Sequence, residues 1–174
     1  MPKWTTACPD WAERLRAGRS IIPPPIFPEE AEAGLAVMRD LRIVDAPGSP
    51  RMQDACGQWV FDLAATIFGA YDAQTGRRLI KEWFVMLPKK NFKSGLAASI
   101  MLTSLIRNWR RSAEFTILAP TKEVAENSFG PAKDMVTFLE DDEDEDCSEL
   151  ADLIHVQEHY KTLTHREMNA KLKV

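Results

Sequence analysis

Apolar residues recur at three- and four-residue intervals over two early segments, and this spacing predicts two amphipathic helices. The first segment is Glu29–Leu41, whose first turn is acidic and directly follows Pro28. In the second, the apolar positions run from Trp59 to Phe68, and Gly69 is expected to end the helix. Residues 29–68 are therefore predicted to hold two helices, whereas residues 1–28 carry little regular pattern.

Two segments around these helices carry residues that break regular structure. Pro23–Pro28 has four prolines in six positions, which predicts an extended surface segment and excludes a helix or a central strand. Asp72–Arg78 is typical of a turn, with Gly76 at the hairpin position. The two helices are therefore expected to be flanked by irregular chain.

After this turn the apolar period changes from helical to strand-like. Leu79–Leu87 predicts a strand that ends at a proline, and Ala113–Pro120 predicts a second, buried strand. The two alternate with predicted helices over Ser94–Trp109 and Thr121–Leu139. Such an alternation is typical of a parallel βαβ unit with a right-handed crossover. Further on, "LIHVQ" and "LKV" are short possible strands.

Composition narrows the class of protein without naming a function. The chain has 174 residues, of which 45% are hydrophobic, and this suits one globular domain or one domain with an appendage. No run of about 18 apolar residues occurs, so no membrane span is expected. The first residues lack the apolar core of a secretion signal. The three widely spaced cysteines are expected to be free thiols in a reducing cytoplasm.

Negative charge is concentrated in one run. The formal net charge is −4, and Glu140–Asp146 holds seven consecutive acidic residues. Because like charges repel and resist packing, this run is expected to be a solvated loop. Metal binding and mimicry of DNA are the minor alternatives.

The stretch "LPKKNFKS" (residues 87–94) has the layout of a phosphate-binding loop between a predicted strand and a predicted helix. Lys93 and Ser94 occupy the places of the lysine that reaches the β- and γ-phosphates and of the hydroxyl that ligates magnesium. Both glycines of the usual pattern are missing, and Leu87 and Phe92 stand in their places. The simpler alternative is a turn between strand and helix with an exposed basic tip.

The wider string resembles a known family. "LPKKNFKSGLAASIMLTSLI" followed by "AEFTILAPTKEVAENSFGPAKDMV" is similar to the N-terminal ATPase region of phage large terminase subunits of the HK97-like group. Their deviant Walker A loop resembles "PRKNGKS", and this chain differs from it only by a lysine for arginine and by Phe92 for glycine. The resemblance extends over essentially the whole chain.

The resemblance implies a fold and an activity. The fold would be α/β, with an incomplete P-loop NTPase (RecA/ASCE-like) parallel sheet in residues 76–174 and a mainly helical and extended segment in residues 1–75. Such proteins are ATP-driven motors that push viral DNA into a procapsid and cut it with a separate nuclease domain. Implied partners are ATP, Mg²⁺, DNA, a small terminase subunit, the procapsid portal and further copies of the chain, in the bacterial host cytoplasm.

The family likeness also assigns roles to residues. Lys93 would contact the β- and γ-phosphates, Ser94 would ligate magnesium, and Lys89 or Lys90 would neutralise charge near the transition state. Gln58 resembles a glutamine that reads adenine, although a surface amide is the plainer interpretation. The nucleotide-binding set implied by the resemblance is Gln58, Pro88, Lys89, Lys90, Asn91, Phe92, Lys93, Ser94 and Gly95.

Some family elements have no counterpart in this sequence. No apolar strand ending in an acidic pair, the Walker B element, is found up to Val174, and neither is the nuclease domain. Hydrolysis by this chain alone is therefore expected to be near background. The alternative function is a non-enzymatic remnant or interaction module from a decayed or split prophage gene.

Two smaller clusters complete the candidates. "HVQEH" (His155–His159) matches a zinc-peptidase pattern, but the surroundings are strand-like and surface histidines are the better interpretation. Arg107, Arg110 and Arg111 form a basic cluster at the end of the predicted helix 94–109, where cations are favoured anyway.

Overall fold

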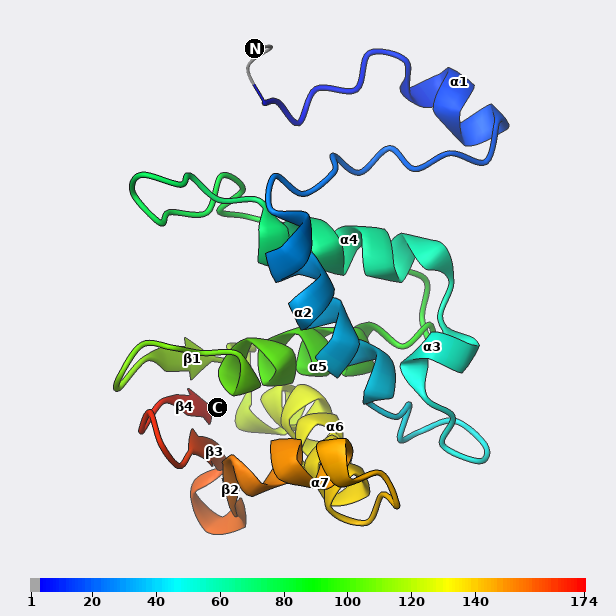
Figure 1. Cartoon of the computed structure of the whole chain (residues 1–174). Coiled ribbons are helices and arrows are strands. Elements are labelled where there is room, and N and C mark those ends of the chain that lie inside the picture. The colour runs from blue at the N-terminus through cyan, green and yellow to red at the C-terminus, as the bar shows by residue number, and fades with distance from the viewer. Residues whose placement is uncertain (1–3) are drawn as a thin grey trace. The chain divides into compact units, whose positions relative to one another are not determined.

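The computed structural model of the chain describes residues 4–174 (Figure 1). The chain folds into two compact units. The first unit consists of Met1–Ala36 and Cys56–Val85, and the second consists of Val37–Ala55 and Met86–Val174. The long helix α2 (Pro28–Asp40) begins in the first unit and ends in the second.

The first unit contains the predicted helices and one further short helix that the sequence pattern does not predict. Besides α1 (Trp11–Arg16) it holds most of α2 and all of α4 (Gln58–Gly69). Both predicted amphipathic helices are therefore confirmed, and α4 ends at the predicted glycine. The turn after α4 is confirmed too, because Gly76 has a positive φ of 65° and Tyr71 bridges to Arg78.

The proline-rich segment packs against the end of α4. The backbone N–H groups of Ile26 and Phe27 both donate to the carbonyl oxygen of Gly69, at 3.0 and 2.9 Å. The Phe27 ring stacks on Tyr71 with 4.2 Å between centroids. A Cβ atom on Gly69 would lie 2.6 Å from Cβ of Pro25, so only glycine allows this close approach. The segment is extended as predicted, but it is half-buried rather than simply on the surface.

The second unit is built on a small mixed sheet with the strand order β1-β4-β3-β2. β1 pairs in parallel with β4, whereas β3 pairs antiparallel with both β2 and β4. The short strands expected near residues 155 and 173 are confirmed, whereas β3 was not predicted from the sequence. The strands are β1 (Glu114–Thr116), β2 (Ile154–Gln157), β3 (Thr162–His165) and β4 (Lys171–Lys173).

Helices pack beside this sheet and supply most of the core of the second unit (Figure 1). They are α3 (Met52–Ala55), α5 (Lys93–Ile106), α6 (Lys122–Glu140), α7 (Glu145–Asp152) and the 3₁₀ turn η1 (Glu158–Tyr160). Thr121 is the predicted N-cap of α6, and its side chain accepts a hydrogen bond from the Val124 N–H at 3.3 Å. The largest fully buried side chains of α5 and the sheet include Leu102, Leu105, Leu163 and Leu172.

The α/β class is confirmed, but the predicted parallel sheet is wrong. Leu79–Leu87 forms no ladder with any described strand, and Phe84 and Met86 on it are 91% and 81% exposed. β1 is only three residues long and largely exposed, rather than the buried strand expected over Ala113–Pro120. An apolar alternating pattern becomes a strand only when a partner satisfies its backbone hydrogen bonds. The predicted parallel pairing of these two segments is therefore absent among the described residues.

The acidic run is not simply a solvated loop. Glu140 ends α6, and the Asp144 side chain caps α7 by accepting from the Asp146 N–H at 3.1 Å. Asp142 turns inward, with its side chain only 6% exposed. The prediction of a solvated loop is therefore wrong for Asp142, because arginines far away in the sequence neutralise its carboxylate.

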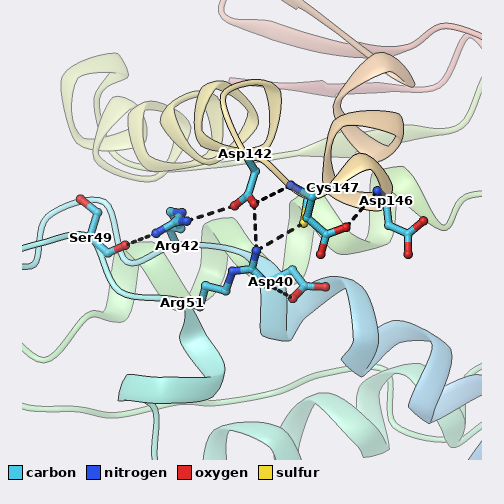
Figure 2. A network of polar contacts seen from close by, with 8 residues as sticks. Asp40, Arg42, Ser49, Arg51, Asp142, Asp146 and Cys147 are labelled. Carbon is cyan, nitrogen blue, oxygen red and sulfur yellow. Dashed lines mark hydrogen bonds and ion pairs between the residues drawn. The ribbon is translucent and has the colours of Figure 1, made fainter.

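Those arginines form the polar network drawn in Figure 2. The two carboxylate oxygens of Asp142 accept from Arg42 at 3.0 Å and from Arg51 at 2.9 Å, and Arg51 also pairs with Asp40 at 3.0 Å. A hydrogen bond from the Asp144 N–H, together with the two guanidinium groups, lowers the pKa of Asp142. Burial raises the pKa of Asp40, and the nearby Asp144 and Asp142 carboxylates add to this rise. The network ties the segment after α2 to the link between α6 and α7.

The cysteines and the helices can be compared with two expectations from the sequence. Cys8, Cys56 and Cys147 are all free thiols, as predicted, and burial raises the pKa of Cys56 and Cys147. Among residues 4–174, none of the helices combines the length and the apolar character that a membrane span requires.

Candidate phosphate-binding site

The candidate loop lies between the extended segment that ends at Pro88 and the start of α5. The chain turns sharply here because two residues, Lys90 and Phe92, adopt left-handed backbone conformations with φ of 65° and 52°. Phe92 is the N-cap of α5, and it makes no side-chain capping bond. The residue that replaces the expected glycine therefore has the left-handed conformation that glycine adopts most easily.

The first turn of α5 provides donors for an anion. The N–H groups of the first three helical residues, Lys93, Ser94 and Gly95, have no partner within the helix by its geometry. The first intrahelical bond of this end joins the Leu96 N–H to the Phe92 carbonyl at 2.8 Å. These amides and the positive end of the helix dipole point to the same place, which is the arrangement that favours phosphate.

The Lys93 side chain folds back over the loop. Its Nζ atom donates to the carbonyl oxygens of Leu87 and Pro88, at 3.0 and 2.9 Å, and both contacts are exposed. These acceptors cannot be predicted from the sequence, because every residue has a backbone carbonyl and the residue type does not show which carbonyl a side chain will meet. A phosphate group that approaches the turn would compete with two neutral carbonyls for this ammonium group, and a charged acceptor is the stronger one.

The rest of the loop adds positive charge and local rigidity. Lys89 and Lys90 are exposed and make no ion pair among the described residues. The Asn91 amide donates to the carbonyl oxygens of Pro88 and Lys89, at 3.4 and 3.2 Å. Three lysines therefore surround one hydrogen-bonded turn, and this residue set fits a polyphosphate.

Phe92 also shapes the first turn through its ring. A Cβ atom built on Gly95 would lie 1.9 Å from Cε2 of Phe92, so the ring rests directly on the glycine. Any residue with a Cβ atom at position 95 would clash with the Phe92 ring, so this position requires glycine. The ring of Phe92 is half-buried against the first turn of α5.

Replacing Phe92 with glycine is expected to raise the free energy of unfolding by about 1 kcal/mol, because a non-glycine residue in the left-handed region costs about 1–2 kcal/mol. Loss of the ring's contact with Gly95 offsets part of that gain. Urea denaturation measures the change. Asn91→Gly is the matched control, since Asn91 has no positive φ and loses two hydrogen bonds on substitution. A less stable Phe92→Gly variant would show that ring packing outweighs backbone strain.

Ser94 and Gln58, two of the predicted ligands, belong to different units of the chain. Ser94 is in the first turn of α5, next to Lys93, where its hydroxyl fits the role of a magnesium ligand. Gln58 is the first residue of α4 in the first unit, and its amide donates to Asp62 of the same helix at 3.0 Å. Residues 87–95 are therefore the part of the candidate site that lies within the second unit.

The histidine pattern lies on different elements. His155 is on β2 and His159 is in η1, and both side chains are exposed. They do not share a helical face, as the zinc-peptidase pattern requires. The interpretation as surface histidines is confirmed.

Comparison with known proteins finds a solved structure with a similar fold. The sequence matches no family model and no curated protein. The structure is similar to the crystal structure of the HK97 bacteriophage large terminase, with a TM-score of 0.61 and 20% sequence identity. The match covers 82% of this chain and 26% of that protein, so this chain spans about a quarter of the length of the HK97 terminase. The resemblance inferred from sequence is thus confirmed for the fold: this chain is similar to one part of a phage large terminase.

Proposed function

We propose that this chain is the ATP-binding part of a phage or prophage terminase large subunit, which moves DNA into a procapsid. The observation that carries the proposal is the loop at residues 87–95, set at the start of α5 in a fold similar to that of the HK97 terminase. Under this proposal the chain works with DNA, a small terminase subunit, the portal and further copies of itself, in the bacterial host cytoplasm.

The proposed chemistry follows from the groups at the loop. Lys93 exchanges its two carbonyl acceptors for oxygens of the β- and γ-phosphates, and the first-turn amides of α5 bind the same group. Lys89 or Lys90 neutralises the remaining phosphate charge. The Ser94 hydroxyl would hold magnesium in this loop, and the ion would neutralise part of the phosphate charge.

Nucleotide titration tests the proposal. In the presence of Mg²⁺, the wild-type chain is expected to bind ATP, and Lys93→Ala is expected to weaken binding at least about tenfold through loss of a charge-assisted contact. Calorimetry measures both affinities. Lys122→Ala is a close control, because Lys122 is also an exposed lysine at the first position of a helix.

The possible outcomes separate specific binding from general attraction. An equal loss in Lys122→Ala would reduce the effect to net charge and contradict the proposed site. If the wild type fails to bind at millimolar ATP, Phe92→Gly becomes the deciding variant. Binding restored by Phe92→Gly would assign the failure to that residue, and continued failure would refute nucleotide binding by this chain.

A further inference from the structure

A second cationic surface lies at the other end of α5 from the phosphate loop. The loop that joins α5 to β1, residues 107–113, carries Trp109 with 80% of its surface exposed. Arg110 and Arg111 follow it directly and are exposed as well. An indole this exposed is unusual in a folded chain, since tryptophan is on average among the well-buried residues. The 14 residues of α5 separate this loop from Lys93 by about 20 Å at 1.5 Å per residue.

The loop is held in a defined turn. The Asn108 side chain donates to the Arg110 carbonyl at 2.7 Å and accepts from the Arg110 N–H at 3.2 Å. Ser112 takes a left-handed conformation, with φ of 53°, and its N–H donates to the Met168 carbonyl at 2.8 Å. The loop is thereby fixed to the β3–β4 connection, and Trp109 stands on a constrained turn. Less conformational entropy is lost when such a surface binds a partner.

The charges of this surface are nearly all positive. Residues 107–112 hold three arginines and no acidic residue, and the adjacent β3–β4 connection adds Arg166 and Glu167. The nearby Glu114 is already paired with Lys173 at 2.9 Å. Arg110 and Arg111 make no ion pair among the described residues.

The end of a helix does not explain this cluster. α5 ends at Ile106 with Arg107 as its C-cap, so the helix dipole favours a cation at Arg107. Arg110 and Arg111 lie beyond the cap, and the dipole gives no reason for an exposed indole. Guanidinium groups beside an exposed aromatic ring are the combination that binds nucleic acids, through phosphate contacts and ring stacking.

We propose that the Trp109–Arg110–Arg111 loop binds the phosphodiester backbone of DNA. The two guanidinium groups contact phosphate oxygens, and the indole packs on the sugars of a duplex or on an unstacked base of a single strand. This inference rests on the proposed function, to which it adds the place where DNA meets this part of the chain. It does not depend on nucleotide, because it uses none of the residues of the phosphate loop.

Fluorescence anisotropy tests the proposal with two labelled probes, a mixed-sequence duplex of about 20 base pairs and one of its strands. With the whole chain and the duplex, Arg110→Ala/Arg111→Ala is expected to reduce the slope of log affinity against log salt by about 1.8, which is two phosphate contacts. Trp109→Ala is expected to weaken binding of the single strand about tenfold, through lost stacking, and of the duplex by less.

The matched control is Arg77→Ala/Lys81→Ala, which removes two exposed cations from the first unit. Circular dichroism confirms that each variant folds. Loss of affinity for either probe in the loop variants, with the control unchanged, supports the proposal and identifies the form of DNA. An equal loss in the control, or unchanged binding of both probes in the loop variants, overturns it.

One more variant separates this inference from the proposed function. Lys93→Ala is expected to leave DNA affinity within about twofold of the wild type, since one charge lost from a distant exposed site has little effect at moderate salt. Loop-dependent DNA binding without ATP binding would refute the nucleotide proposal alone. ATP binding without loop-dependent DNA binding would refute this inference alone.

Discussion

Replacing Asp142 with alanine is expected to lower the free energy of unfolding by about 2 kcal/mol, because two arginines lose the partner they share. The Asp142 side chain is 6% exposed and accepts from Arg42 and Arg51 at 3.0 and 2.9 Å. Removing it leaves two guanidinium groups, each with less than a third of its side chain exposed, next to a hole. Urea denaturation at neutral pH measures the change.

Glu143→Ala is the control for this variant. Glu143 belongs to the same acidic run, is exposed, and carries no interaction among the described residues. Its removal is expected to change stability by less than about 0.5 kcal/mol, as for most exposed positions. Equal effects of the two substitutions would mean that relief of repulsion within the run, and not the arginine network, governs stability here.

The contribution of Asp142 to the free energy of unfolding is expected to change with pH in one direction. The folded chain lowers the pKa of Asp142, so the contribution is present above the ordinary carboxyl pKa and is lost as pH falls through the lowered value. The stability difference between wild type and Asp142→Asn should therefore shrink from neutral pH to about pH 3. The pH dependence of stability that Asp40 contributes has the opposite sign, because burial raises the pKa of Asp40. A difference that stays constant over this range would exclude the charged pairing as its source.

Replacing Leu102 with alanine is expected to lower the free energy of unfolding by about 3 kcal/mol, the usual cost of a cavity in a packed core. Leu102 lies within α5 and is 0% exposed, in the packing of this helix with the core of the second unit. The candidate loop at residues 87–95 leads into the start of the same helix. Loss of packing at Leu102 therefore weakens the support of the candidate site as well.

Leu118→Ala makes the same chemical change at a residue that is 87% exposed. It is expected to change stability by less than about 0.5 kcal/mol, because little apolar surface leaves water there on folding. Urea unfolding of the two variants, side by side, measures the contribution of burial alone. An equal loss of stability in both variants would contradict the burial of Leu102 in the core.

The candidate site was largely readable from the sequence, because its parts are neighbours in the chain. Residues 87–95 contain the lysines, the hydroxyl and the helix start, and a turn before a helix gives converging amides by local geometry alone. The conformation of Phe92 and the carbonyl partners of Lys93 were not readable. A residue type does not fix its own φ, and side-chain partners depend on how the turn closes.

The strand predicted over Leu79–Leu87 shows that the apolar pattern of one segment is not enough to predict a strand. The apolar residues are there, but strand pairing needs a second segment with free backbone groups at the right distance. The helices did not meet this problem, since a helix satisfies its backbone hydrogen bonds within one segment. For the same reason β3, whose partners are β2 and β4, could not be located from its own four residues.

The sequence alone determined the helices α2, α4, α5 and α6, the Thr121 cap and the position of the candidate loop at residues 87–95, because each depends on residues within a few turns of one another. Tertiary structure decided which apolar segments pair as strands and which carboxylate of the acidic run is buried. Asp142 meets Arg42 across 100 positions of sequence, and no local pattern encodes such a contact. Only the packed chain brings those charges together, and their mutual neutralisation allows the carboxylate to leave water.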